Sequence, residues 1–364
     1  MESYHVIIAG SGPAGCATAI ALAQQSPALA RRTLLLEKQR HPRPKLCGGG
    51  LTTHADVFLQ RLGLSPNLPA VPIHAVRFRF RGAQIRLRAN IFRVVHRPEF
   101  DAWLANQVRA QGVELHEDEP LLDLRPAGDG VEVVTARSTY RAQVVVGADG
   151  SNSLVRQRLG LPGPRRVARL LEIFTPADPA TAPEFREGLA VLNFTPVLQG
   201  IQGYCWDFPC LVNGRGYINR GIFDCRVDER RRGPLKETFA ATLQALGLRL
   251  DDYELKGHPE RWLDRPTEVA RPHVLLAGDA AGAEPLFGEG ISHALAYGLV
   301  AAEEIAAAFA QGDFSFSGYK ARLLHSELGR QLVRKRRLAK VLYRVRHPIP
   351  WLIGYGLVNL VLHS

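Results

Sequence analysis

A glycine-rich turn near the start of the chain constrains the fold more than any other feature. The apolar run from Tyr4 to Ala9 is typical of a buried strand, and the alanine-rich segment 14–25, which has no internal proline, favours a helix. Glycines at such a strand-to-helix turn allow backbone N–H groups and the helix N-terminus to approach a pyrophosphate. The residues of this predicted phosphate site are Gly10, Gly12, Pro13, Ala14 and Gly15.

An acidic residue follows the next predicted strand. The apolar run Thr33–Leu36 ends at Glu37, which lies 22 positions after Gly15. A carboxylate at the end of a second parallel strand is suited to hydrogen-bond the ribose of a dinucleotide. A strand, turn and helix without any ligand would share the glycines but would not need this carboxylate. We therefore favour a dinucleotide site.

Two further glycine motifs follow in order. Residues 146–153 are Val-Gly-Ala-Asp-Gly-Ser-Asn-Ser, residues 276–282 are Leu-Ala-Gly-Asp-Ala-Ala-Gly, and residues 288–290 are Gly-Glu-Gly. The first two of these motifs each follow an apolar run that predicts a buried strand. One motif alone would be weak, but the ordered set predicts a chain folded around a single flavin dinucleotide.

Length and cysteine content limit the class of protein. A chain of 364 residues allows two or three domains, each able to bury a core. The first strand begins by residue 4, which leaves no room for a signal peptide ahead of it. No Cys-x-x-Cys pair occurs among the five cysteines, which are Cys16, Cys47, Cys205, Cys210 and Cys225. We expect reduced thiols in the cytoplasm, with neither a disulfide framework nor a metal site.

Changes of pattern along the chain predict a discontinuous domain organisation. Residues 75–95 alternate arginine with apolar residues, which predicts a hairpin with one solvated face, and residues 97–110 predict a helix with Pro98 in its first turn. Residues 166–264 carry short strands and no dinucleotide motif, as in an inserted antiparallel sheet. Residues 291–309 are apolar almost all round, broken only by Gly298, and predict a buried helix.

We therefore expect an α/β fold in three parts. A Rossmann-like FAD-binding domain is predicted over residues 1–72, 97–165 and 265–312. A substrate-binding domain built on an antiparallel β-sheet is predicted over residues 73–96 and 166–264, and a C-terminal helical tail over residues 313–364.

The net charge of +11 gathers near the C-terminus. Residues 320–347 hold ten Lys or Arg against the single acidic Glu327 and predict one amphipathic helix, followed by a short apolar end. Leu328, Leu332, Leu338, Val341 and Leu342 are spaced to line its apolar face. Two interpretations stay open: residues 320–364 lie on an anionic membrane surface, or the helix packs on its own domain with a solvated basic face. Nucleic acid is not expected, since no base-reading module accompanies the charge.

Together these motifs resemble the flavin-dependent oxidoreductases with the para-hydroxybenzoate hydroxylase fold, over residues 4–310. Within that group the chain is most similar to the geranylgeranyl reductases. Residues 45–51, Lys-Leu-Cys-Gly-Gly-Gly-Leu, resemble that family's glycine loop, and residues 204–209, Tyr-Cys-Trp-Asp-Phe-Pro, match its aromatic motif. Gly282 stands where aromatic hydroxylases of this fold usually carry histidine.

The resemblance implies roles for individual residues. Backbone N–H groups at Gly290 and Ile291 would face the flavin pyrimidine and stabilise negative charge on the reduced flavin. Asp279 would bind the ribityl chain, and Arg97 would border the cofactor. The complete set of implied FAD contacts is Gly10, Gly12, Pro13, Ala14, Gly15, Glu37, Lys38, Lys45, Gly48, Gly49, Arg97, Asp149, Asp279, Gly288, Gly290 and Ile291.

The glycine loop and the aromatic motif are the predicted reaction site. Three consecutive glycines indicate that backbone must approach a flat ring closely, with Cys47 at the edge. Cys47, Tyr204 and Trp206 are the predicted catalytic residues, although Cys47 as a space-filling thiol and the aromatic residues as ordinary core are the alternatives. The predicted substrate contacts are Gly50, Phe208, Pro209 and Pro285.

Two segments depart from the family pattern. Cys210 follows Pro209 where a lysine often stands, and residues 284–287, Glu-Pro-Leu-Phe, are more acidic and aromatic than usual. These departures bear on the substrate and leave the FAD prediction intact.

The resemblance implies an FAD-dependent reductase that saturates C=C bonds of an isoprenoid lipid. Hydride would come from N5 of the reduced flavin, and the proton from Cys47, Tyr204 or water. The alternatives are an FAD-dependent monooxygenase acting on a hydrophobic aromatic or prenylated compound, and a non-redox flavoprotein similar to lycopene cyclases. No second dinucleotide motif is visible, so NADPH and ferredoxin are both open as the external reductant.

Overall fold

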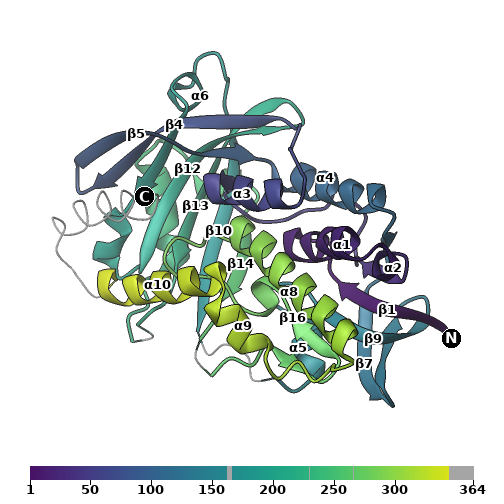
Figure 1. Cartoon of the computed structure of the whole chain (residues 1–364). Helices are drawn as coiled ribbons and strands as arrows, with labels where there is room; N and C mark the ends of the chain where they lie inside the picture. Colours follow the sequence, from purple (N-terminus) through teal and green to yellow (C-terminus); the bar gives the residue numbers. More distant parts are fainter. Residues whose placement is uncertain (162–165, 229, 265, 344–364) are drawn as a thin grey trace.

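Two large β-sheets organise the molecule, one toward the lower right of Figure 1 and one toward the upper left. The computed structural model describes residues 1–161, 166–228, 230–264 and 266–343. The predicted α/β architecture is confirmed, because one sheet is built mainly of parallel strands beside helices and the other mainly of antiparallel strands.

The first sheet is centred on β1 (Glu2–Ala9), which pairs in parallel with β2 (Thr33–Leu36) and β9 (Thr139–Gly147). These strands are rich in valine, isoleucine and leucine because both faces of a parallel sheet are covered. Its other strands are β6 (Glu114–His116), β7 (Leu121–Ala127), β8 (Gly130–Thr135), β15 (Ala270–Arg271) and β16 (Val274–Leu276).

The second sheet has the strand order β14-β10-β13-β12-β11-β4-β5-β3. The arginine-rich hairpin predicted from period two is present as β4 (Ala70–Phe80) and β5 (Ala83–Val95). The boundary predicted at residue 72 therefore falls inside β4. The remaining strands are β3 (Gly50–Thr52), β10 (Val167–Pro176), β11 (Leu189–Asn193), β12 (Gly203–Val212), β13 (Arg215–Asp224) and β14 (Lys256–Arg261).

Helices α1 (Pro13–Gln25) and α8 (Ile291–Gln311) lie against each other beside the first sheet (Figure 1). Their backbones approach closely at Gly298, where an added Cβ atom would lie 2.4 Å from the Cβ atom of Ala17. The predicted buried helix is thus present, and its glycine permits the close packing. In the described part of the chain, α8 alone is long and apolar enough to cross a membrane, and most of it is buried inside the molecule.

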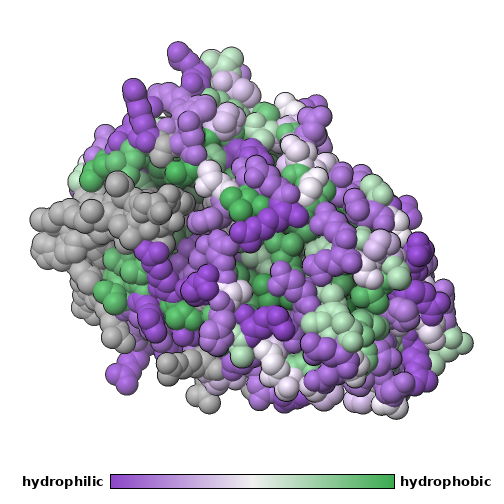
Figure 2. All heavy atoms as spheres, viewed as in Figure 1, coloured by the Kyte–Doolittle hydropathy of each residue, from purple (hydrophilic) through white to green (hydrophobic). Residues whose placement is uncertain are grey.

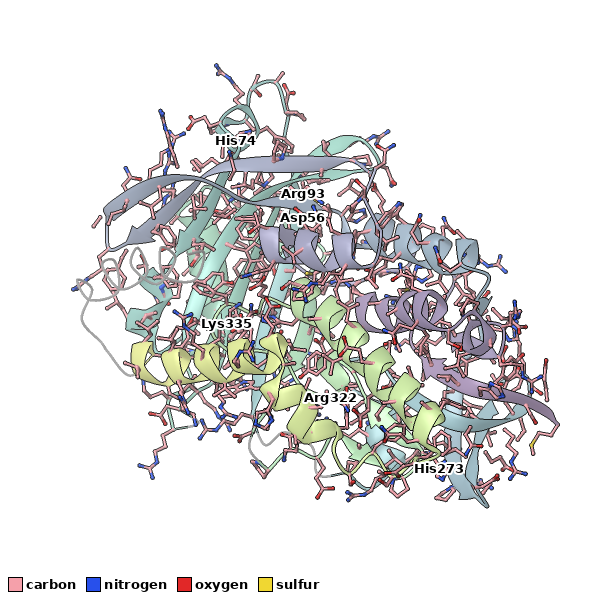
Figure 3. All side chains as sticks on the ribbon, viewed as in Figure 1. Asp56, His74, Arg93, His273, Arg322 and Lys335 are labelled. Carbon is pink, nitrogen blue, oxygen red and sulfur yellow. The ribbon has the colours of Figure 1, made fainter. Side chains whose placement is uncertain are left out.

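The shorter elements connect and cover the sheets. Helix α4 (Arg97–Ala110) begins at the predicted residue, and α3 (Thr53–Arg61) is tied to β5 by an ion pair of 2.6 Å between Asp56 and Arg93, both labelled in Figure 3. The others are α2 (Pro27–Ala30), α5 (Leu154–Arg158), α6 (Pro183–Arg186), α7 (Leu235–Gln244) and the 3₁₀ turns Thr195–Gln199, Leu250–Asp252 and Gly278–Ala280.

The C-terminal segment differs from its prediction. The expected single basic helix is two helices, α9 (Tyr319–His325) and α10 (Glu327–Leu342), because Ser326 is extended and its Oγ atom accepts the N–H of Gly329 at 3.2 Å. Leu328 and Leu332 are buried as predicted, but Val341 is 63 % exposed. The apolar end assigned to a membrane surface, residues 344–364, lies outside the described residues. Figure 2 shows a face on which hydrophilic residues predominate.

Candidate active site

The structure brings the three glycine motifs together at one end of the first sheet. Because β1, β9 and β16 are parallel neighbours, the turns that follow them meet at one edge. The N–H of Ala148 donates to the carbonyl of Ala9 at 2.9 Å, and the hydroxyl of Ser151 donates to Asp279 at 3.4 Å. The motifs at 10–15, 146–153 and 276–282 therefore form a single site.

The first glycine turn has two crowded positions and one open one. At Gly10, where φ is +103°, an added Cβ atom would lie 2.5 Å from the carbonyl oxygen of Ala148, and at Gly15 it would lie 1.9 Å from the carbonyl oxygen of Gly10. At Gly12 the nearest neighbour would be the Arg43 guanidinium at 3.8 Å. Gly12 thus presents bare backbone at the start of α1, as an approaching phosphate requires.

Glu37 belongs to a buried network that the sequence analysis did not predict. Its Oε2 atom accepts the N–H and hydroxyl of Ser11 at 3.1 and 2.7 Å and lies 3.0 Å from Nε of Arg43. Arg43 also lies 3.5 Å from Asp101, which pairs with Arg97 at 3.0 Å. Asp101 is fully buried between these two arginines.

Asp149 caps a helix in addition to lying at the junction of the motifs. Its Oδ2 atom accepts the backbone N–H groups of Leu154 and Val155 at the start of α5, at 2.6 and 3.1 Å. Its Oδ1 atom is buried and has no hydrogen-bond partner in the described parts of the chain. Burial raises the pKa of this carboxyl above its ordinary value.

A mainly apolar cavity of about 230 Å³ lies between the glycine loop, the aromatic strand β12 and the loop 288–291. The structure gathers most of the predicted reaction site here, but Pro209 and Pro285 are buried elsewhere and do not line the cavity. Helix α10 supplies Gln331, Arg334 and Lys335 to the same wall. The predicted residues that line it are Cys47, Gly48, Gly49, Gly50, Tyr204, Trp206, Phe208, Gly288, Gly290 and Ile291.

The glycine loop is required by neighbours within the protein itself. An added Cβ atom at Gly48 would lie 3.2 Å from the ring of Phe208. At Gly49, where φ is +76°, it would lie 2.2 Å from the carbonyl oxygen of Val95. The close approach that three glycines predicted is therefore made, at these two positions, to β5 and to the aromatic wall.

Tyr204 and Trp206 are fixed by hydrogen bonds as well as by packing. The hydroxyl of Tyr204 donates to the carbonyl of Phe287 at 2.5 Å, and Nε1 of Trp206 donates to Asn219 at 2.9 Å. Both side chains are buried in the apolar core of the second sheet, and both also line the cavity. They are therefore core residues and residues of the predicted reaction site at the same time. The indole has room only because Gly221 has no side chain: a Cβ atom there would lie 2.1 Å from the Trp206 ring.

Hydrogen bonds fix the backbone of Cys47 at both its N–H group and its carbonyl group. Its N–H donates to Glu172 at 3.0 Å and its carbonyl accepts from Asn219 at 2.9 Å. Its Sγ atom accepts the N–H of Gly49 at 3.4 Å. Burial lowers the pKa of the Arg97 guanidinium, but Asp101 and a hydrogen bond with the Cys47 side chain raise it, with a net increase. Neither Glu172 nor Asn219 was predicted, since no motif marks them.

The acidic residue Glu284, in the segment that departs from the family pattern, has a structural role. Glu284 is buried and accepts the backbone N–H groups of Leu286, Phe287 and Glu289 at 2.5, 3.0 and 3.0 Å. It therefore shapes the loop that leads to α8.

Lys335 of α10, labelled in Figure 3, reaches inward to this loop. Its ammonium group bonds to Glu289 and lies 3.9 Å from Glu284. Burial alone would raise the pKa of Glu289, but Lys335 lowers it well below its ordinary value. Thr52 and Ser292 also donate to Glu289, each at 2.7 Å, so the carboxylate joins β3, α8 and α10.

Lys45, His258 and Glu260 form the polar margin near Asp279. Nζ of Lys45 lies 3.2 Å from Nε2 of His258. Burial, followed by the charges of Asp279 and Glu284, raises the pKa of Glu260 well above its ordinary value. Its Oε2 atom is buried without a partner in the described segments and lies 3.2 Å from the Cβ position of Gly288. Lys38, another predicted FAD contact, is exposed to solvent.

These residues fit a flavin dinucleotide. Gly12 and Gly290 present bare backbone with space in front of it, at the two places where a pyrophosphate and a flavin ring are expected. Buried oxygens of Asp149 and Glu260 have hydrogen-bonding capacity left over. The mainly apolar cavity begins beside Gly288–Gly290, where the ring of a bound flavin would form part of its wall. The fold and site together define a flavoprotein of the para-hydroxybenzoate hydroxylase type.

Comparison with known proteins agrees with this class. Residues 3–313 match the family described as FAD binding domain, and the chain belongs to that family. It is an FAD-dependent oxidoreductase. The predicted fold class and the predicted resemblance to geranylgeranyl reductases are both confirmed.

The most informative relatives are reductases. The chain is 28 % identical to a menaquinone reductase of Mycolicibacterium smegmatis, over 93 % of this chain and 84 % of that protein. It is also 28 % identical to digeranylgeranylglycerophospholipid reductase 2 of Methanopyrus kandleri, over 87 % and 80 %. A geranylgeranyl bacteriochlorophyll reductase-like protein from Thermoplasma acidophilum shares the fold, with a TM-score of 0.75, 20 % identity and coverage of 94 % and 87 %.

Proposed function

We propose that this protein reduces C=C bonds in the isoprenoid chain of a lipid. The observation that carries the proposal is the apolar cavity, in which Cys47 and the aromatic wall face the loop 288–291. Two relatives whose names describe reductases of a prenylated quinone and of a prenylated phospholipid support the same substrate class.

The first part of the proposal concerns the cofactor. FAD, when bound and reduced, supplies hydride to one alkene carbon. Gly10, Gly12 and Gly15 would hold its pyrophosphate, and Asp279 would hold its ribityl chain. The backbone of Gly290 and Ile291, at the start of α8, would stabilise negative charge on the reduced ring.

The protein itself would orient the alkene, exclude water from it and donate a proton to it. An isolated alkene accepts hydride poorly, so the chain must hold it in a fixed pose and exclude water. Trp206, Phe208 and Phe92 present a rigid apolar wall for this purpose. Cys47 lies on the same cavity and is the proton donor we favour, because the Tyr204 hydroxyl is already bonded to Phe287.

Anaerobic reoxidation tests the proposal. The FAD-loaded protein is reduced with dithionite, freed of excess reductant, and mixed without oxygen with menaquinone or geranylgeranyl diphosphate. We expect the flavin to reoxidise and the lipid to gain two hydrogen atoms by mass spectrometry. A flavin that stays reduced until air is admitted, and then inserts oxygen into the lipid, would overturn the proposal and favour the monooxygenase alternative.

Two associated proposals concern partners. The external reductant is NADPH or ferredoxin, which stopped-flow reduction of the bound flavin by each donor distinguishes.

Peripheral membrane contact through residues 320–364, in an otherwise cytoplasmic protein, predicts sedimentation with anionic vesicles that high salt reverses.

A further inference from the structure

A second, smaller cavity also borders Cys47. It has a volume of about 40 Å³, and apolar residues such as Val95 and Phe174 form part of its wall. We call it the polar cavity because Lys45, His96, Arg97, Glu172, Asn219 and Lys256 also line it. This volume is sufficient for a water molecule with several polar partners. Cys47 borders both cavities, so this residue lies between the mainly apolar cavity and the smaller one.

We propose that Glu172, in this polar cavity, holds the proton that restores the Cys47 thiol after each turnover. Glu172 lies on β10 and is 2 % exposed. Its Oε2 atom accepts the Cys47 N–H and the Asn219 amide at 3.0 and 3.1 Å. Both of these hydrogen bonds are made to Oε2, and Oε1 makes none within the described residues, so this second oxygen is available to carry a proton.

The groups around Glu172 come from every element packed against it. Lys256 lies opposite it on β14, and Arg97, His96 and Lys45 line the same cavity. Cys210 on β12 is close enough for the Glu172 charge to raise the pKa of that thiol, after the larger effect of burial. Burial raises the pKa of Glu172 to about 7, against the lowering by Asn219, the Cys47 N–H, Lys256 and Arg97. A carboxyl that titrates near neutrality exchanges protons readily under working conditions.

Cys47 would supply the proton of the reduction. One alkene carbon would receive hydride, with its two electrons, from bound reduced FAD, and the other would receive the proton of the Cys47 thiol. Arg97 and the Gly49 N–H stabilise the thiolate that remains. The Glu172 carboxyl then gives its proton to the thiolate through water in the cavity, and the carboxylate regains a proton from solvent. The lipid would gain one hydride and one proton, and bound reduced FAD would supply the two electrons.

Selective alkylation tests the link between Glu172 and Cys47 without any lipid. Cys47 is half-buried whereas the other four cysteines are buried, so a small alkylating agent reports on Cys47 in the FAD-loaded protein. Above about pH 7 the Glu172 carboxylate opposes formation of the thiolate, so the wild-type rate should rise less steeply there. Glu172→Gln should remove this inflection and raise the rate at pH 8 severalfold.

Asp207→Asn is the matched control, because it removes a carboxyl on β12 of the same sheet that pairs with Arg220 at 2.5 Å, outside the polar cavity. Its alkylation profile should match the wild type. An unchanged profile in Glu172→Gln would overturn the proposal, and so would the same change in Asp207→Asn. Mass spectrometry of the modified peptide confirms that Cys47 is the thiol measured.

Turnover provides the second readout and rests on the proposed function. Glu172→Gln should lower kcat by on the order of 10²-fold with FAD content and KM retained, and the pH dependence near neutrality should disappear. In a Cys47→Ala background the same substitution should have no further effect, because the two residues act in series. Full additivity would overturn the relay. Failure of the wild type to reduce any lipid would refute the proposed function, while the alkylation profiles would still decide the role of Glu172.

Discussion

At the scale of single residues, the site depends on glycines that make room for larger neighbours. Gly221 on β13 is the clearest example, since the Trp206 indole occupies the space where its side chain would be. A sequence shows Trp206 within a motif, but it does not show that a residue fifteen positions later must lack a side chain. That requirement arises only when β12 and β13 pair, with Trp206 opposite Gly221.

Gly221→Ala should therefore displace the Trp206 ring into the cavity. We expect turnover of lipid to fall at least tenfold, FAD content to remain normal, and stability to fall by about 1–3 kcal/mol from overpacking. Thermal unfolding, flavin absorbance and steady-state kinetics measure the three quantities. Gly257→Ala on β14 is the control, because its Cβ atom would make only an ordinary contact of 3.4 Å with Leu171. Equal activity of the two variants would show that the indole position is not critical.

The buried charges are the residues least accessible to sequence reasoning. Distant partners fix these side chains: Arg43 contacts Asp101, Glu172 contacts Asn219, and Asn219 contacts Cys47. Nearer partners are Glu37 for Arg43 and Trp206 for Asn219. Nothing in the local pattern identifies such partners. The Arg97–Asp101 pair is different, because its spacing of four in a predicted helix could have been recognised as an ion pair.

At the scale of elements, local patterns predicted what they physically control. Alternation of arginine with apolar residues gave the β4–β5 hairpin, and the proline at the second position of α4 marked its start. The division between α9 and α10 was missed although Ser326 followed by Glu327 is a recognisable N-terminal signal for a helix. The basic residues continue on both sides of Ser326, so the charge pattern alone predicted one uninterrupted helix.

Helix packing provides a prediction at this scale. Gly298→Ala would place a methyl group 2.4 Å from Ala17 and 2.7 Å from the backbone nitrogen of Thr18. Alanine favours a helix over glycine by about 1 kcal/mol, so propensity alone would stabilise this variant. We expect the opposite, with a lower melting temperature and weaker FAD retention, because α1 carries the phosphate-binding turn.

Gly318→Ala serves as the control for that experiment, since its added methyl group would meet no atom within 4 Å. Differential scanning calorimetry and FAD release on gel filtration compare the two. A Gly298→Ala protein as stable as the wild type would show that α1 and α8 can separate slightly without cost to the site.

At the scale of the whole molecule, α10 joins the C-terminal segment to the cofactor site. Lys335 is buried beside Glu289 and Glu284, which shape the loop before α8. Lys335→Met should leave two buried carboxylates without their cation and cost about 3–5 kcal/mol, with FAD affinity reduced. Arg337→Met, on the exposed side of the same helix, should leave both stability and affinity nearly unchanged.

The pH dependence of this ion pair has a definite sign. The pKa of Glu289 is lowered in the folded protein, so its contribution is complete above the ordinary glutamate value of 4.5 and is lost as the pH falls further. The difference in unfolding free energy between the wild type and Lys335→Met should therefore shrink below about pH 4.5, as urea titrations at several pH values would measure. A constant difference would show that Lys335 stabilises by packing alone.

The location of Lys335 also bears on biosynthesis. The turn that we propose for the pyrophosphate directly precedes α1 and is synthesised well before α10, the last helix described, whose Lys335 supports the loop that we propose for the flavin ring. A nascent chain can thus assemble the opening turn long before it can secure the loop preceding α8. Tight flavin capture is consequently expected only after α10 has been synthesised, and ribosome-stalled chains lacking α10 should emerge without stable yellow colour.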